Sequence, residues 1–161
     1  EEKELETLNT KNDHVEFMVY LEKGNGSRYY EGDKFNVIFH SPEKLFLSMI
    51  YRDVNGNLTK IYQSKTPFSA EEVHTIPPVG APQWEVDCRI GCGPESLVVI
   101  ASTSRIPDNI IDQQLNLQRS WDLPNTLNEI FKVLDLETTQ KRGVSKVRSS
   151  FKVLSVTTVG N

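Results

Sequence analysis

The sequence predicts a mostly β fold: an antiparallel β-sandwich of immunoglobulin-like or related topology, with one C-terminal amphipathic α-helix and a final strand. Three observations predict it. Several short segments alternate apolar and polar residues, turn-forming residues recur about every ten positions, and one late segment repeats its apolar residues at helical spacing. With 161 residues, the chain is long enough to bury a core without disulfides or bound metal.

Four strands are predicted in the first half of the chain. The segment 15–21 alternates apolar and polar residues, and after a Gly- and Asn-rich turn at 24–27 the segment 35–39 does the same. The segment 45–51 carries apolar residues on both faces, which is typical of a central strand. It is followed by 58–62, and the short connection between these two segments predicts a hairpin.

The middle of the chain contains a connection and two further predicted strands. Pro and small polar residues dominate 67–82, which favours a long surface connection over a helix or a central strand. The segment 84–90 alternates strictly and directs Cys88 toward the core, whereas 97–101 is continuously apolar, as in a buried strand. Since 91–94 has the composition of a tight reversal, we expect these two strands to pair antiparallel.

The last part of the chain predicts a helix and a strand. Apolar residues recur at helical spacing over 123–136, Asp122 is a suitable N-cap, and Pro124 lies in the first turn, where its missing N–H costs little. The segment 150–159 is rich in β-branched residues, which favours a final strand. This strand either closes the sheet or exchanges with a second copy, so we expect a monomer or a weak dimer.

Residues 14–161 are expected to form a single β-sandwich domain, preceded by a flexible leader or linker at 1–13, where charged residues show no apolar period. The formal charge of −4, from 18 basic and 22 acidic residues, argues against a nucleic-acid partner. Because the chain begins at Glu1 and not at Met, we expect that a leader or a tag was removed. An extracytoplasmic location, periplasmic or at the cell surface, and a membrane tether through the removed segment fit this expectation.

The loop at 53–57 joins the two hairpin strands and raises the question of a calcium site. Asp53, Asn55 and Asn57 supply oxygen atoms at alternate positions, as calcium ligands do. The EF-hand pattern fails twice, because Gly56 is fourth instead of sixth and the twelfth position lacks a bidentate Glu. Asn-Gly between two apolar strands favours a type I′ or bulged turn, and calcium binding is the minor alternative.

Cys88 and Cys92 are the only two cysteines. Extended backbone would place their α-carbons about 13 Å apart, whereas a disulfide needs less than about 7 Å. A disulfide therefore requires the chain to reverse at Gly91, and the alternatives are a buried Cys88 with a loop Cys92, or a metal-binding pair. Three residues separate the two thiols, so the redox CxxC motif is absent.

Motifs for catalysis, metal binding or cofactor binding are absent from the sequence. The three histidines, His14, His40 and His74, fall in different predicted elements without the spacing of metal ligands. The sequence has no nucleophile elbow, no Walker loop and no dinucleotide-binding glycine pattern. We therefore expect no catalytic residue and no cofactor.

Aromatic residues outside the predicted strand cores are candidates for contact with a partner. Tyr29, Tyr30 and Trp121 are of this kind, because aromatic side chains with a polar end are enriched at interfaces. Trp84 is a further candidate, with packing in the core as its alternative interpretation. Packing of the two tyrosines within a hairpin is the alternative interpretation.

The order of several short motifs resembles the bacterial domain of unknown function family 4384 over about residues 15–107. The shared landmarks are YYEGD at 29–33, Ser41 before the strand that starts at Leu45, DVNG at 53–56, Ile76-Pro77, GPE at 93–95 and IAS at 100–102. The chain has Gln63-Ser64 where the family usually has Pro-Asn, and its cysteines are not part of the family pattern. The resemblance implies a non-catalytic accessory domain attached to larger bacterial envelope or signalling proteins.

Two function classes follow. The first is a non-catalytic interaction domain of an exported bacterial protein, which binds a protein or glycan partner through strand edges or loops. The second is a thiol- or metal-dependent enzyme, or a calcium-binding module, centred on Cys88, Cys92 and the loop from Asp53 to Asn57. The surroundings of the two cysteines distinguish these classes, since an enzyme of the second kind needs an ionisable partner beside the thiol.

Overall fold

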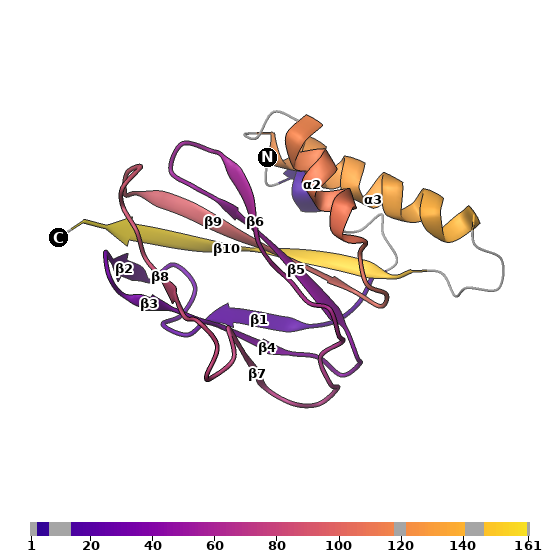
Figure 1. Ribbon diagram of the computed structural model, residues 1–161, viewed down its shortest axis with the longest axis horizontal. Coiled ribbons are helices and arrows are strands. Elements are labelled where there is room, and N and C mark those ends of the chain that lie inside the picture. Colours follow the sequence, from indigo (N-terminus) through magenta and orange to yellow (C-terminus); the bar gives the residue numbers. More distant parts are fainter. Residues whose placement is uncertain (1–2, 7–13, 118–121, 141–146, 161) are drawn as a thin grey trace.

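The computed structural model describes residues 3–6, 14–117, 122–140 and 147–160 (Figure 1). It confirms a mostly β fold with a late helix and a C-terminal strand. The elements of this described part are β1 (Met18–Leu21), β2 (Arg28–Tyr30), β3 (Lys34–Phe35), β4 (Val37–His40), β5 (Phe46–Arg52), β6 (Leu58–Gln63), β7 (His74–Ile76), β8 (Trp84–Glu85), β9 (Pro94–Ser102), α2 (Asp108–Leu117), α3 (Leu123–Gln140) and β10 (Ser149–Val159). Residues 3–6 form one helical turn before them.

The strands of the described part form three sheets. The largest has the order β2-β10-β9-β5-β6, the second has the order β1-β4-β7, and β3 pairs with β8 alone. All pairings are antiparallel except that of β2 with β10, which is parallel. The large sheet is therefore mixed, which corrects the prediction of a purely antiparallel sandwich, and an immunoglobulin-like strand order is not confirmed.

The central strands of the large sheet are buried on both faces. On β9, Leu97 and Val99 contact one hydrophobic core while Val98 and Ile100 contact another, because successive side chains of a strand point to opposite faces. The predictions that 45–51 and 97–101 are central, two-sided strands are confirmed, since β5 and β9 pair with each other inside the large sheet.

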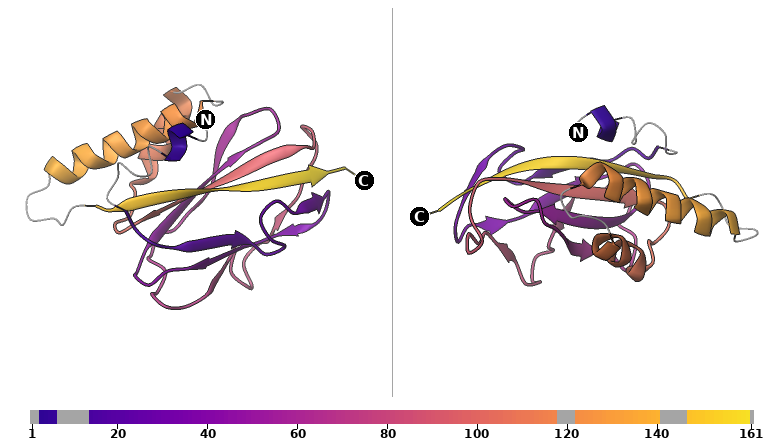
Figure 2. Two further views of the ribbon diagram at one scale, coloured as in Figure 1. Left: turned by 180° about the vertical axis from the view of Figure 1, so that it is seen from behind. Right: turned by 90° about the horizontal axis from the view of Figure 1, so that it is seen from above.

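The two cores define three layers. The first core lies between the large sheet and the sheet β1-β4-β7, and the second lies between the large sheet and the helices. Figure 1 shows β1, β4 and β7 on one side of the large sheet and both helices on the other, and the two views of Figure 2 agree with this arrangement. The sandwich therefore needs the helices to cover the second face of its larger sheet.

Helix α3 confirms the predicted amphipathic helix at 123–136. Asp122 caps it, because its Oδ1 accepts the N–H of Asn125 at 3.2 Å. Helix α2 was not predicted: its ten residues are mostly polar, and only Ile110, Ile111 and Gln114 are buried, too few to show a helical period. Leu5 in the helical turn at 3–6 packs against the same core.

Three predictions for the middle of the chain are wrong: the length of the strand at 84–90, its pairing with the strand at 97–101, and the surface connection at 67–82. The segment 84–90 is a strand only at β8, and it pairs with β3 and not with β9. The chain turns after Glu85, so Ile90, which strict alternation would bury, is exposed. The segment 67–82 is not entirely a surface connection, because β7 pairs with β4 and buries Ile76. Local composition failed here because pairing with a distant strand decides these short elements.

The predicted final strand at 150–159 corresponds to β10, which begins one residue earlier. It lies between β9 and β2 of the same chain and runs along the whole length of β9. Its inward residues Leu154 and Val156 belong to the first core, and Phe151 on the opposite face belongs to the second. In this structure β10 is thus an inner strand of the large sheet of its own chain. The weak dimer remains a prediction.

Candidate binding groove

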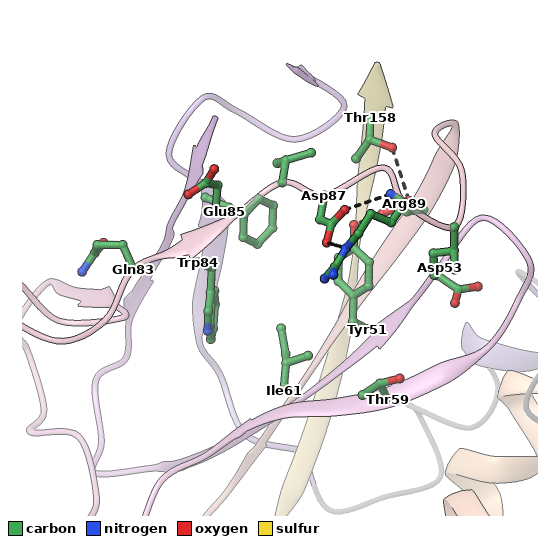
Figure 3. A pocket seen from close by; sticks show the side chains of 14 residues that line it. Tyr51, Asp53, Thr59, Ile61, Gln83, Trp84, Glu85, Asp87, Arg89 and Thr158 are labelled. Atoms are coloured by element: carbon green, nitrogen blue, oxygen red, sulfur yellow. Dashed lines mark hydrogen bonds and ion pairs between the residues drawn. The ribbon is translucent and has the colours of Figure 1, made fainter. Parts of the chain in front are cut away.

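A groove of about 730 Å³ lies at the end of the large sheet where β10 ends and β9 begins (Figure 3). It is bounded by the β5–β6 hairpin on one side and by the segment 83–90 on the other. Its lining residues are Phe35, Tyr51, Asp53, Thr59, Ile61, Gln83, Trp84, Glu85, Val86, Asp87, Arg89, Ile90, Glu95 and Thr158. Aromatic, acidic and hydrogen-bonding side chains from distant parts of the chain thus meet at one opening.

The hairpin loop on one side of the groove is held by Asp53. Its Oδ1 accepts the N–H groups of Asn55 and Asn57 at 2.9 and 3.0 Å, and the N–H of Gly56 donates to the Asp53 carbonyl. Gly56 has a φ of 85° whereas Asn55 has no positive φ, so the turn is the bulged alternative and not type I′. The oxygen proposed as a calcium ligand thus binds the backbone of its own loop.

The other side of the groove reverses direction at Gly91. This residue has a φ of 127°, its N–H donates to the Cys88 carbonyl at 3.0 Å, and the α-carbons of Cys88 and Cys92 are 5.1 Å apart. The two cysteines form a disulfide, so neither carries a free thiol. A Cβ at Gly91 would lie 3.1 Å from a methyl group of Val54, which shows that the disulfide loop packs against the hairpin loop.

Asp87 and Arg89 form the charged rim of the disulfide loop. Nε of Arg89 lies 2.5 Å from Oδ2 of Asp87, and the Arg89 backbone N–H donates to Oδ1 at 2.8 Å. The backbone hydrogen bond and then the guanidinium lower the pKa of the Asp87 carboxyl. In Figure 3 dashed lines join Asp87 to Arg89.

Glu95 is a buried acidic residue in the lining of the groove. Period two along β9 directs it to the same face as the core residue Leu97, and it is only 8% exposed. The hydroxyl of Tyr51 donates to its Oε2, and Oγ1 of Thr158 donates to its Oε1 at 3.2 Å. Burial is the main effect on this carboxyl and raises its pKa.

Glu95 was missed in the sequence because the predicted strand began at Leu97. The two-residue alternation of this strand, continued backward from Leu97, places Glu95 at the next inward position. A carboxyl at an inward position of a strand is the signal that could have identified it. Tyr51 and Thr158 come from β5 and β10, the two neighbours of β9, so no local motif joins the three residues.

Aromatic rings form the other part of the groove. The ring centroid of Trp84 lies 6.2 Å from that of Phe35 and 6.2 Å from that of Tyr62, so the indole is held by packing from two sides. Figure 3 shows the side chains of Trp84, Ile61 and Tyr51 around the same opening. The groove therefore offers apolar ring surface beside polar groups, a combination typical of binding sites.

Of the aromatic residues predicted to contact a partner, Trp84 lines this groove, whereas Tyr29 and Tyr30 do not. Tyr29 is 1% exposed and its ring packs against Phe35, which corrects its assignment as a surface contact. Tyr30, the next residue on β2, points outward and is 47% exposed. Trp121 lies outside the described residues. Of the two tyrosines, Tyr30 is the one whose side chain the structure places at the surface.

The three histidines lie outside this groove. His14 and His40 line a second hollow beside Lys152, and Nε2 of His74 lies 3.0 Å from the carbonyl oxygen of Ser69. Across the described ranges, no three His, Cys, Asp or Glu side chains are grouped as a metal site would need. In the same ranges, no helix is long and apolar enough to cross a bilayer.

Comparison of the chain with known protein families, with curated proteins and with solved structures finds no match to any of them. The resemblance to the bacterial family 4384 therefore remains a prediction from the sequence. The function is therefore inferred from the groove.

Proposed function

We propose that the chain is a non-catalytic binding domain of an exported bacterial protein and that it holds a protein or glycan partner in the groove beside Trp84. The observation that carries this proposal is the composition of the groove, in which Trp84, Tyr51 and Ile61 provide apolar surface and Asp53, Gln83 and Thr59 surround it with hydrogen-bonding groups. Interfaces are typically anchored by such an aromatic centre with a polar rim.

The scaffold supports this function because it fixes both walls of the groove. The hairpin loop is closed by the Asp53 side chain, and the opposite loop is closed by the disulfide between Cys88 and Cys92. A site whose walls are already ordered loses little conformational entropy when it binds. We further propose that the two sheets act as an immunoglobulin-like sandwich that presents its end loops to the partner.

An extracytoplasmic place of action is part of the proposal. A disulfide between Cys88 and Cys92 supports it, because disulfides persist in oxidising compartments such as the bacterial periplasm. The resemblance to family 4384 points in the same direction. A strand edge offers a second contact surface, since β6 is an edge of the large sheet next to the groove.

The test is a binding screen followed by two variants. Labelled protein is screened on glycan and peptide arrays, and the best ligand is measured with Trp84→Ala and Tyr30→Ala. We expect Trp84→Ala to weaken binding about tenfold or more, as loss of an aromatic anchor does, and Tyr30→Ala to change it less than about twofold. A folded Trp84→Ala variant that binds like the wild type contradicts the proposal, and loss of binding in Tyr30→Ala would move the site to β2.

A further inference from the structure

We infer that the groove takes a cationic group, the ammonium or guanidinium of a basic peptide segment, and that Glu95 is its counter-ion. This inference rests on the proposed function, because it names the ligand class of the same groove. Three properties of the described residues carry it: the isolation of the Glu95 carboxyl, the aromatic surface next to it, and the charge of the lining.

The Glu95 carboxyl is buried without a cationic partner. Its carboxylate oxygens accept hydrogen bonds from the hydroxyl groups of Tyr51 and Thr158, and none of the ion pairs in the described ranges includes it. Each carboxylate oxygen has two acceptor sites, and one hydroxyl occupies one of them on each oxygen. Both oxygens can therefore accept a further N–H donor from a ligand, which would also provide the missing positive charge.

Aromatic rings next to a carboxylate favour the same kind of ligand. The Tyr51 side chain that contacts Glu95 also lines the groove, and Trp84 and Phe35 line it as well. Cations are attracted to the faces of such rings, most strongly to Trp and Tyr, and more so where water is excluded. A lysine or arginine side chain entering between Trp84 and Glu95 would meet ring surface along its stem and the carboxyl at its end.

The charge of the lining favours a cation over an anion. The lining carries four carboxyl groups, on Asp53, Glu85, Asp87 and Glu95, against the single guanidinium of Arg89. Arg89 is paired with Asp87, and Glu85 is paired with Lys34 at 3.3 Å. Asp53 and Glu95 take part in none of the ion pairs within the described ranges, so the groove can still neutralise an incoming positive charge.

Binding of a cation at Glu95 is coupled to pH. A cation stabilises the ionised carboxyl, whereas burial favours the neutral form, so affinity should increase as pH rises and Glu95 loses its proton. The other groups facing this region are Tyr51 on β5, Asp53 in the hairpin loop, and Asp87 with Arg89 in the disulfide loop; Thr158 on β10 does not titrate. The Asp87 pKa is lowered and the Glu95 pKa is raised, so the Asp87 carboxyl is already ionised over the pH range in which Glu95 loses its proton.

The test uses three peptides and the full chain. An acetylated and amidated peptide of alternating glycine and lysine is compared with one of equal length in which glutamine replaces lysine, by calorimetry at constant ionic strength. We expect the lysine peptide to bind at least about tenfold more tightly, and its affinity to rise from about pH 5 to about pH 7.5. A glutamate peptide is the anionic comparison and should bind least.

Two variants assign the effect to Glu95. Glu95→Gln should weaken the lysine peptide about tenfold or more and remove most of the pH dependence, because the counter-ion is lost while the shape is kept. Glu85→Gln removes an exposed carboxylate from the same rim and should weaken binding by about threefold or less. If Glu95→Gln does not fold, the pH profile of the wild type and its selectivity for lysine over glutamine test the inference without it.

The outcomes separate this inference from the proposed function. Equal binding of lysine and glutamine peptides, no saturable binding of either, or unchanged affinity in folded Glu95→Gln overturns the cationic ligand. A neutral glycan or peptide that binds the wild type and is lost in Trp84→Ala would leave the proposed function standing and the inference wrong. If Trp84→Ala changes the binding of no ligand, both fail.

Discussion

The hydroxyl of Tyr51 on β5 donates a hydrogen bond to the carboxyl of Glu95 on β9, although 44 positions separate the two residues along the chain. In the ladder, Tyr51 lies opposite Leu97, so Glu95 is its diagonal neighbour on the same face of the sheet. The pair closes the bottom of the groove with polar groups at a position where the alternation would otherwise bury apolar residues. A buried acid at such a position should affect both stability and binding.

The first prediction concerns pH and stability. The folded-state pKa of Glu95 is raised above its ordinary value of 4.5, so the folded protein holds this proton more tightly than the unfolded chain. The contribution of Glu95 to the free energy of unfolding is therefore most favourable below the ordinary pKa and declines as pH rises toward the folded-state pKa. Glu95→Gln cannot titrate, so the wild type should lose stability relative to this variant as pH rises from about 4.5 through the raised folded-state pKa.

Urea unfolding of both proteins at several pH values measures this difference. Asp33 and Asp87 have lowered pKa values and act in the opposite direction, but both proteins contain them, so their effects cancel in the comparison. A wild-type stability that stays constant relative to Glu95→Gln, or rises with pH, would show that Glu95 is ionised as easily in the folded state as in the unfolded chain.

How far the sequence predicts this fold depends on how local each signal is. The hairpin of β5 and β6 and the capped helix α3 carry their signals within a few residues, in Asn55-Gly56 and in Asp122 before an apolar period. The strands β7 and β8 are two or three residues long, and pairing with β4 and β3 decides them. Such pairing is invisible to a local pattern, so both were misassigned.

The groove was predictable only in parts. The loop at 53–57 and the two cysteines were identified as features of interest, and the structure places Asp53 in the lining and the disulfide loop along one wall. Their meeting with Trp84 and Glu95 follows from the order of strands in the large sheet and from the turn after β8. Neither the strand order nor that turn has a signature in the neighbouring residues, which is why the sequence grouped Trp84 with Tyr29 and not with Glu95.

The second prediction tests the helical layer. Leu127 on α3 is fully buried in the core between the helices and the large sheet, whereas Leu117 at the end of α2 is 76% exposed. Leu127→Ala should lower the free energy of unfolding by about 2–5 kcal/mol, because it removes buried methyl groups and leaves a cavity. Leu117→Ala is the matched control and should change it by less than about 0.5 kcal/mol in urea unfolding. Similar losses in both variants would contradict the packing of α3 on the sheet.

The third prediction concerns the start of α3. Oδ1 of Asp122 accepts a hydrogen bond from the N–H of Asn125, one of the donors that a helix leaves unpaired at its N-terminus. Asp122→Ala should lower the free energy of unfolding by about 1 kcal/mol, and Asp122→Ser should retain most of it because serine also caps helices. Thermal unfolding followed by circular dichroism distinguishes the two variants. Equal destabilisation by alanine and serine would mean that the carboxylate acts by its charge and not as a cap.

The fourth prediction concerns the disulfide that closes the loop between Cys88 and Cys92. Replacing both cysteines by serine opens a ring of five residues. The chain-entropy relation gives about 2 kcal/mol of lost stability for such a ring, which urea unfolding should show as a lower midpoint with an unchanged slope.

The disulfide loop also carries Arg89 and Ile90 into the groove, so the serine variant should bind the ligand of the groove more weakly. Wild-type protein treated with reductant should reproduce both effects, and its mass should increase by two hydrogen atoms, since the chain contains no other cysteine. If treatment with reductant leaves the mass unchanged, or if the serine variant has the wild-type midpoint, the loop is held by its packing on Val54 and not by a covalent bond.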